Sequence, residues 1–277
     1  MTTPNPFDLQ RLGDCEWIQS IEFRETTPST NDLAKQLIQQ QSCQSSIEGI
    51  ATSCPKLVLT ASQTAGRGQH DRTWWSGQGS LTFSLIEVIS EPTMPLTTGL
   101  ATALALTNWV RDINSQVDAR IKWPNDLFVN GRKMAGILIE SIHSTDSKFQ
   151  IVGVGINVNN LPPELPQEVC RSATSLTECT GEQYDLTDLL IHWLMHYAKS
   201  QVLRRTDPQQ LIANCLNQSE TILGQTVTLD LPDGNRIEGK FAGLSERGGI
   251  LLIESGHQRE FLSATLNIDA GRTPDVS

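Results

Sequence analysis

The sequence predicts an α+β fold, with a large domain built on a mixed sheet and a small all-β module after it. Up to residue 218, strand-like and helix-like segments alternate without a regular βαβ pattern. The Asn130-Gly131 pair between two apolar runs is typical of an antiparallel hairpin. From about residue 221, helical periodicity gives way to short strands. We therefore expect one domain over residues 1–218 and a second over residues 219–277.

The first part of the chain predicts two helices and three strands. A Ser-Thr-Asn start at residues 29–31 can cap the first helix. Pro124 ends the third strand, because the residue before a proline is held in an extended conformation. The predicted order is helix 29–41, strand 56–63, strand 80–88, helix 96–113 and strand 119–123.

The second part begins with the hairpin, which joins residues 127–129 to residues 132–142. Residues 149–159 follow as its expected antiparallel neighbour, and helices are predicted at about 186–204 and 209–216. Turn signals then separate four short strands within residues 225–262. A module of this size and composition predicts a small barrel of the SH3 type.

Composition limits the partners of the protein. The 277 residues carry a formal net charge of −10, which argues against nucleic acid as the main partner. No apolar run is long enough for a membrane span, and the N-terminus lacks the features of a signal peptide. The six cysteines form no CxxC pair and are expected to be reduced. We expect a cytoplasmic protein with no nucleic-acid or membrane partner.

Two predicted strands present small residues on one face. Along residues 149–159, Gly153, Gly155 and Asn157 alternate with branched apolar residues. Along residues 80–86, serines and a threonine alternate with Leu, Phe and Leu in the same way. Glycines on one face leave bare backbone, against which either a flat ligand or a closely packed helix could lie. Periodicity alone does not show whether the two strands line the same slot.

Residues 66–72 form a loop of two glycines and two arginines. Glycine N–H groups and guanidinium groups suit a phosphate or an adenylate. The loop is neither a Walker A sequence nor a GxGxxG fingerprint. Lys122 lies at the end of a predicted strand, before Trp-Pro-Asn-Asp, and its ammonium group could neutralise a phosphate or the negative charge that develops in a reaction. The alternative is a surface lysine at a sheet edge.

Other catalytic patterns have less support. His192 and His196 lie four residues apart on a predicted helix, but Trp193 stands where the glutamate of an HExxH motif would be. We expect a packed or surface histidine pair rather than a zinc site. The chain has no GxSxG motif, so covalent catalysis through the enzyme has no support from the sequence.

Five motifs, taken in order, resemble those of biotin protein ligases, and the resemblance covers about residues 20–270. The motifs are STN at 29–31, SQTAGRGQHDRTW at 62–74, KWPND at 122–126, GRKMAGILIE at 131–140 and GVGIN at 153–157. The resemblance implies a mixed-sheet domain of the class II synthetase and biotin–lipoyl ligase type, followed by an SH3-like domain. It implies that biotin and ATP form biotinyl-5′-AMP and pyrophosphate. A lysine of a biotin carboxyl carrier domain then displaces AMP.

The same resemblance assigns roles to particular residues. Lys122, Arg67 and Arg72 are expected to be catalytic, and Mg²⁺ is expected on the phosphates of ATP rather than on a protein metal site. The implied biotin-binding residues are Ser29, Thr30, Asn31, Gln63, Gly66, Arg67, Gly68, Gln69, Lys122, Gly136, Gly153 and Gly155. The implied ATP- or adenylate-binding residues are Arg67, Arg72, Trp74, Lys122, Asn125, Lys133 and Asn157.

The chain also departs from the family pattern. Many relatives carry arginine at the position of Gln69 and glycine at that of Asp71, which motivates the hypothesis that this loop holds the adenylate less tightly. About 28 residues precede the STN motif, too few for a winged-helix domain, so a ligase without repressor function is expected.

Two other functions remain as alternatives: a lipoate or octanoate ligase of the same fold, and a biotin-binding protein without activity. The lipoyl enzymes usually carry an RRxxGGGxVxH-like loop, which is missing here. The expected acceptor is the carrier domain of acetyl-CoA carboxylase or a related carboxylase. The sequence leaves monomer and homodimer open.

Overall fold

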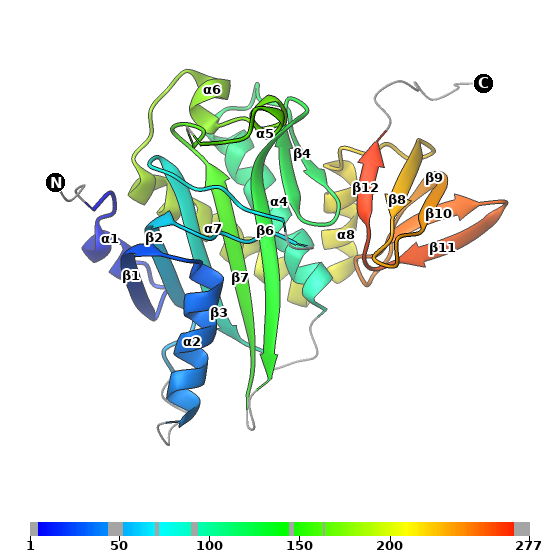
Figure 1. Cartoon of the computed structure of the whole chain (residues 1–277). Helices are drawn as coiled ribbons and strands as arrows, with labels where there is room; N and C mark the ends of the chain where they lie inside the picture. The colour runs from blue at the N-terminus through cyan, green and yellow to red at the C-terminus, as the bar shows by residue number, and fades with distance from the viewer. Residues whose placement is uncertain are drawn as a thin grey trace.

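A mixed seven-stranded sheet with helices on both faces forms the larger part of the protein (Figure 1). The computed structural model describes residues 5–43, 52–69, 72–89, 94–143, 147–162 and 164–268. The order of the strands is β1-β2-β3-β7-β6-β5-β4. Their bounds are β1 (Ser20–Thr27), β2 (Lys56–Gln63), β3 (Ser80–Val88), β4 (Ala119–Lys122), β5 (Asp126–Val129), β6 (Arg132–His143) and β7 (Lys148–Asn157). The mixed sheet and the predicted hairpin are confirmed.

One parallel pair is present that the sequence pattern did not predict. β1 runs parallel to β2, and helix α2 (Thr30–Cys43) connects them, so these elements form a βαβ unit. β1 lies at the edge of the sheet and is mostly half-buried or exposed. Ile21 and Phe23 alternate with polar residues, but the alternation ends at Glu25 and covers only four residues. The strand therefore has only a short signature in the sequence.

The two faces of the large sheet are covered by different helices. Figure 1 shows α2 on one face, and α4 (Pro95–Ile113) and α7 (Leu186–Thr206) on the other. The main core includes Val152, Val154 and Ile156 of β7 together with residues of α4 and α7. A smaller cluster under α2 includes Phe149 and Ile151 of the same strand. The remaining described helices are α1 (Leu9–Gly13), α5 (Gln167–Ser172), α6 (Leu176–Thr180) and α8 (Pro208–Asn217).

The C-terminal module contains five strands where four were predicted. They pair in the order β11-β10-β9-β8-β12 and are all antiparallel. Their bounds are β8 (Thr226–Asp230), β9 (Arg236–Leu244), β10 (Ile250–Glu254), β11 (His257–Phe261) and β12 (Thr265–Ile268). Within the described residues, β11 and β12 are opposite edges and do not pair, so a closed barrel is not confirmed.

The sheet of this module nevertheless curls. Phe261 and Thr265 end and begin the two edge strands, and four residue steps span at most about 14 Å. Opposite edges of a flat five-stranded sheet lie about 19 Å apart. The module packs on the large domain through Trp123, whose Nε1 donates to the carbonyl oxygen of Gly248 at 2.9 Å. None of the described helices is both long and apolar enough to cross a membrane.

Candidate functional site

The floor of the site is one face of β7, whose character changes along the strand. Phe149 and Ile151 on this face pack under α2. The next two residues on the same face are Gly153 and Gly155, followed by Asn157. The apolar cover of α2 thus gives way to bare backbone and then to an amide. The glycine and asparagine part of this face is therefore not covered by the apolar side of α2.

Strand β3 lines the same slot. Its pairing with β7 is antiparallel and places Thr82 opposite Gly155 and Ser84 opposite Gly153. Residues directly opposite each other share a face of the sheet, so the small side chains of both strands belong to one surface. The question that periodicity left open is therefore settled by the register.

The N-terminus of α2 brings a polar cluster onto this surface. Ser84 Oγ lies 2.7 Å from Thr30 Oγ1 and 2.6 Å from Asn31 Oδ1. The backbone N–H of Thr30 donates to Gln63 Oε1 at 2.8 Å. A Cβ atom on Gly153 would lie 2.2 Å from Asn31 Oδ1, so glycine is required for the helix to approach the strand. The Asn31 side chain itself occupies the space above Gly153.

Trp74 occupies the space above Gly155. A Cβ atom on Gly155 would lie 2.2 Å from Cε2 of the indole. The residue pattern left a flat ligand and a closely packed helix open at these two glycines, and the structure places Asn31 of α2 and Trp74 against them. Trp74 Nε1 and Thr82 Oγ1 are buried and have no hydrogen-bond partner among the described residues. Both atoms are free to bind a ligand, because an unmade buried hydrogen bond costs free energy.

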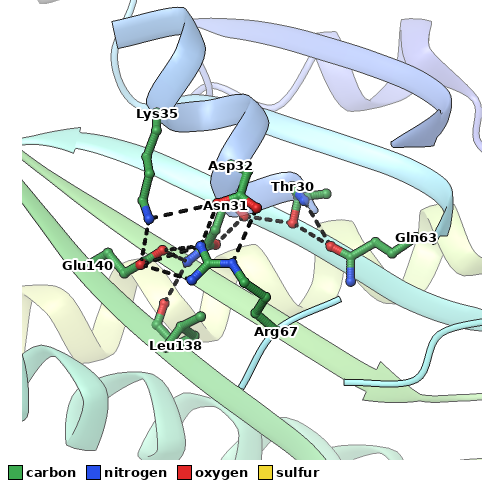
Figure 2. A network of polar contacts seen from close by, with 9 residues as sticks. Thr30, Asn31, Asp32, Lys35, Gln63, Arg67, Leu138 and Glu140 are labelled. Atoms are coloured by element: carbon green, nitrogen blue, oxygen red, sulfur yellow. Dashed lines mark hydrogen bonds and ion pairs between the residues drawn. The ribbon is translucent and has the colours of Figure 1, made fainter. Parts of the chain in front are cut away.

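Arg67 links the glycine–arginine loop to the polar cluster (Figure 2). Its guanidinium donates to both carboxylate oxygens of Asp32, with Nη2–Oδ1 at 2.6 Å and Nε–Oδ2 at 3.2 Å. Nη2 also lies 3.1 Å from Glu140 Oε2. Glu140 accepts from Asn31 Nδ2 at 2.8 Å and from Lys35 Nζ at 2.7 Å. The loop, α2 and β6 therefore share one network of ion pairs.

The charges of this network are reflected in the pKa of Glu140. Partial burial alone would raise this pKa, but the donors from Lys35, Asn31 and Arg67 outweigh burial and lower it below its usual value. Glu140 is thus a carboxylate at neutral pH. The pKa of Arg67 is raised: its partial burial acts in the opposite direction, but Glu140 and Asp32 outweigh it.

A second positively charged side chain, Lys133 of β6, lines the pocket. Lys133 Nζ lies 2.7 Å from Asp126 Oδ1 and would be 3.4 Å from a Cβ atom on Gly136. Residues 133 and 136 differ by an odd number and would normally face opposite sides of a sheet. An irregularity in the pairing of β5 with β6, between Leu127 and Phe128, changes the register. Both residues consequently face the pocket.

These elements enclose a pocket of about 450 Å³, a size typical of small-molecule sites. Short helix α5 and the segment before it close the side opposite α2, through Leu165, Val169 and Ser172. The predicted site residues that line the pocket are Ser29, Thr30, Asn31, Gln63, Arg67, Gly68, Gln69, Arg72, Trp74, Asn125, Lys133, Gly136, Gly153, Gly155 and Asn157.

Two predicted residues do not line the pocket. Lys122 has its ammonium 4.6 Å from the centre of the Phe128 ring. Gly66 is the first residue of the loop, and a Cβ atom there would be 2.3 Å from the carbonyl oxygen of Trp74. Arg72 lines the pocket but donates to Thr265 Oγ1 of the C-terminal module at 3.0 Å. Asp71 lies outside the described residues.

The lining also includes residues that the sequence reasoning did not assign. Thr82 was placed on the correct face of its strand but was given no role, and its alternation with apolar residues was the available signal. Trp75 follows Trp74 in the loop. Leu165 and Val169 lie in a proline-rich segment without periodicity, so no pattern marked them.

Comparison with known proteins gives matches over most of the chain. A model described as the Biotin/lipoate A/B protein ligase family matches residues 24–157. The bifunctional ligase/repressor BirA of Bacillus subtilis is 38% identical over 147 residues, which are 52% of this chain and 45% of that protein. The biotin--[acetyl-CoA-carboxylase] ligase of Mycobacterium tuberculosis is 29% identical over 252 residues, covering 89% of this chain and 88% of the relative.

The fold has a matching solved structure. The biotin protein ligase of Aquifex aeolicus, solved in complex with biotin and ATP, superposes with a TM-score of 0.71 at 27% identity. That match covers 90% of this chain and 99% of the other. The match to the Bacillus subtilis protein, in contrast, spans less than half of that relative's length. Residues 24–157 are therefore a domain of the Biotin/lipoate A/B protein ligase family.

Proposed function

We propose that the protein is an ATP-dependent ligase that attaches biotin to a lysine of a biotin carboxyl carrier domain. In the first step, a carboxylate oxygen of biotin attacks the α-phosphorus of ATP, and pyrophosphate leaves. In the second step, the lysine amine attacks the acyl carbon of biotinyl-5′-AMP, loses a proton, and AMP leaves. Mg²⁺ enters with the phosphates of ATP.

One observation carries the proposal: neutral hydrogen-bonding groups and cations line the same pocket. Thr30, Asn31 and Gln63 offer amide and hydroxyl groups, which suit a neutral ureido ring. Arg67 and Lys133 offer positive charge, which suits a carboxylate next to a phosphate. A ligand that has both a neutral hydrogen-bonding group and an anionic group fits this lining.

Lys133 is the lysine we propose for the charge that develops at the α-phosphate. It lines the pocket beside Gly136, whereas the Lys122 ammonium lies over Phe128. A cation lowers the barrier only where the charge develops, and a displaced lysine loses most of that effect. Lys122 then supports the site from the next strand.

Arg67 is proposed to change partners during the reaction. Its guanidinium is paired with Asp32 and Glu140, and a carboxylate or phosphate of the substrates offers the same kind of acceptor. The exchange would move the Arg67 side chain onto the adenylate and help keep water away from the anhydride. Trp74, Asn125 and Asn157 line the nucleotide side, with Trp74 Nε1 and Thr82 Oγ1 as unused buried groups.

The partners follow from the same proposal. The Mycobacterium tuberculosis relative is named for acetyl-CoA carboxylase, which supports a carboxylase carrier domain as acceptor. The Aquifex aeolicus ligase was solved with biotin and ATP, which supports this pair of substrates. We also propose that the curled C-terminal sheet is SH3-like and that residues 1–218 and 219–277 are the two domains. A role without DNA binding, in the cytoplasm, stays a prediction.

The test is ATP–pyrophosphate exchange with the purified protein, comparing biotin with lipoate and octanoate. Exchange with biotin alone is expected. Exchange with lipoate or octanoate instead would assign the pocket to the other branch of the family. Tight binding of biotin without exchange would favour a binding protein. Exchange that persists in Lys133→Met but is lost in Lys122→Met would reverse the assignment of the lysines.

A further inference from the structure

Three side chains that can bind a metal come together on α4 and α7, the helices on the face of the large sheet opposite the pocket. His192 and His196 lie four residues apart on α7, and Asp112 lies in the last turn of α4. His192 Nε2 is 2.9 Å from Asp112 Oδ2, and His196 Nε2 is 3.3 Å from the same oxygen. The two Nε2 atoms are 3.3 Å apart. Two helices thus direct three ligand atoms to one point.

The three distances match the edges of a tetrahedral metal site. Zinc binds histidine nitrogen and carboxylate oxygen at about 2.0–2.1 Å, which places neighbouring ligand atoms of a tetrahedron about 3.3–3.4 Å apart. Two of the three edges measured here are 3.3 Å, and the third is 2.9 Å. An ion would therefore need only a small movement of the His192 and Asp112 side chains.

Two states of the cluster are consistent with these distances. With both Nε2 atoms protonated, each ring donates to Asp112 Oδ2. With both Nε2 atoms deprotonated, the same three atoms present their lone pairs to one cation.

Electrostatics around the cluster also favours a cation. Asp112 is at the C-terminal end of α4, where the helix dipole disfavours negative charge. Neutral imidazole is the form of histidine that binds metals. The side chains of Asp112 and His192 are 61% and 34% exposed, which leaves a path for an ion.

We propose that Asp112, His192 and His196 bind one Zn²⁺ ion, with water in the fourth position. The ion links α4 to α7, the two helices that cover the face of the large sheet opposite the pocket. Its role is to hold these helices together. The sequence did not reveal it because Asp112 is 80 residues from His192 and belongs to no motif with it. The proposal is independent of the function proposed for the pocket.

The test uses full-length protein stripped of metal and titrated with Zn²⁺ by calorimetry and with Co²⁺ by visible absorption. The expected result is one equivalent of either ion per chain, intense ligand-field bands typical of a tetrahedral Co²⁺ site, and a Tm that rises with added Zn²⁺. A chain that binds no stoichiometric ion, or gives only the weak bands of octahedral Co²⁺, would overturn the proposal.

Variants locate the ion. His192→Ala/His196→Ala should abolish the Co²⁺ bands, and Asp112→Asn, which changes an exposed side chain and leaves the helices intact, should weaken Zn²⁺ binding at least about tenfold. His257→Ala, in exposed β11, is the matched control and should bind the ion like wild type. Equal binding by Asp112→Asn, His257→Ala and wild type would place the ion elsewhere and contradict the assignment.

Discussion

The guanidinium of Arg67 forms a two-pronged ion pair with Asp32, with Nη2–Oδ1 at 2.6 Å and Nε–Oδ2 at 3.2 Å. This pair joins the glycine–arginine loop to the first turn of α2. The side chains are 38% and 40% exposed, so the pair contributes about 0.2–1 kcal/mol. A contact of this strength can order the loop and still yield to an anionic ligand.

Asp32→Asn should loosen the loop in the free protein. Trypsin cleavage after Arg67 and Arg72 should become up to about fivefold faster, because a loss of 0.2–1 kcal/mol raises the open population by that factor. Biotin with ATP should restore protection. Asp14→Asn, an exposed acid outside the network, is the control. An unchanged cleavage rate in Asp32→Asn would show that the ion pair does not order the loop.

Lys133→Met should reduce biotin-dependent pyrophosphate exchange by at least about a hundredfold, the usual effect of removing a group that stabilises developing charge. Lys122→Met should have a smaller effect, since its ammonium lies over Phe128. Exchange kinetics of the two variants, measured at saturating biotin and ATP, give the comparison. Comparable losses in both would mean that Lys122 also reaches the reacting groups.

Gly153→Ala should destabilise the protein by about 1–3 kcal/mol and weaken biotin binding, because the new Cβ would lie 2.2 Å from Asn31 Oδ1 and must displace α2. Urea unfolding and calorimetry with biotin measure the two effects. Gly13→Ala is the matched control, since no atom lies within 4 Å of its Cβ position. A fully stable Gly153→Ala protein with normal biotin affinity would refute the close-packing argument.

Glu140 should make stability depend on pH on the acid side. Its pKa is lowered in the folded protein, so its contribution is complete above the unfolded value of about 4.3 and is lost as pH falls through the folded pKa. The difference in free energy of unfolding between wild type and Glu140→Gln should therefore be largest above about pH 5. Urea unfolding at several pH values tests this. A difference that does not change with pH would remove Glu140 as its source.

Gln69→Arg should slow the release of biotinyl-5′-AMP. Gln69 lines the pocket, and an arginine there adds a guanidinium for the phosphate. Release can be followed by stopped-flow fluorescence of the tryptophans in the loop. Gln19→Arg, on the exposed surface, controls for the added charge. Equal release rates in wild type and Gln69→Arg would mean that Arg67 and Arg72 already retain the adenylate fully.

Regular strands made part of this site predictable from the sequence. The alternation along β3 and β7 is uninterrupted, so the small residues on one face, from Thr82 to Gly155, could be identified without a structure. The edge strand β1 was missed because its apolar alternation covers only four residues, and the segment around Val169 was missed because it carries no periodic apolar pattern.

The directions in which Lys122 and Lys133 point could not be predicted from the sequence alone. Lys122 and Lys133 occupy similar places beside a hairpin, but only the irregularity in the β5–β6 pairing turns Lys133 toward the pocket beside Gly136. A register shift follows from how two strands pair, and neither strand's sequence contains it. The network of Arg67, Asp32 and Glu140 is likewise a product of tertiary packing, since its members come from three separate elements.

The most direct test of the account is the complete reaction, read by intact mass spectrometry of a biotin carboxyl carrier domain. The protein, biotin and Mg·ATP should add one biotinyl group to the carrier domain and none to a carrier whose acceptor lysine is replaced by arginine. Lys133→Met should abolish the product. A carrier domain that stays unmodified by wild-type protein, while a known ligase modifies it, would contradict the account.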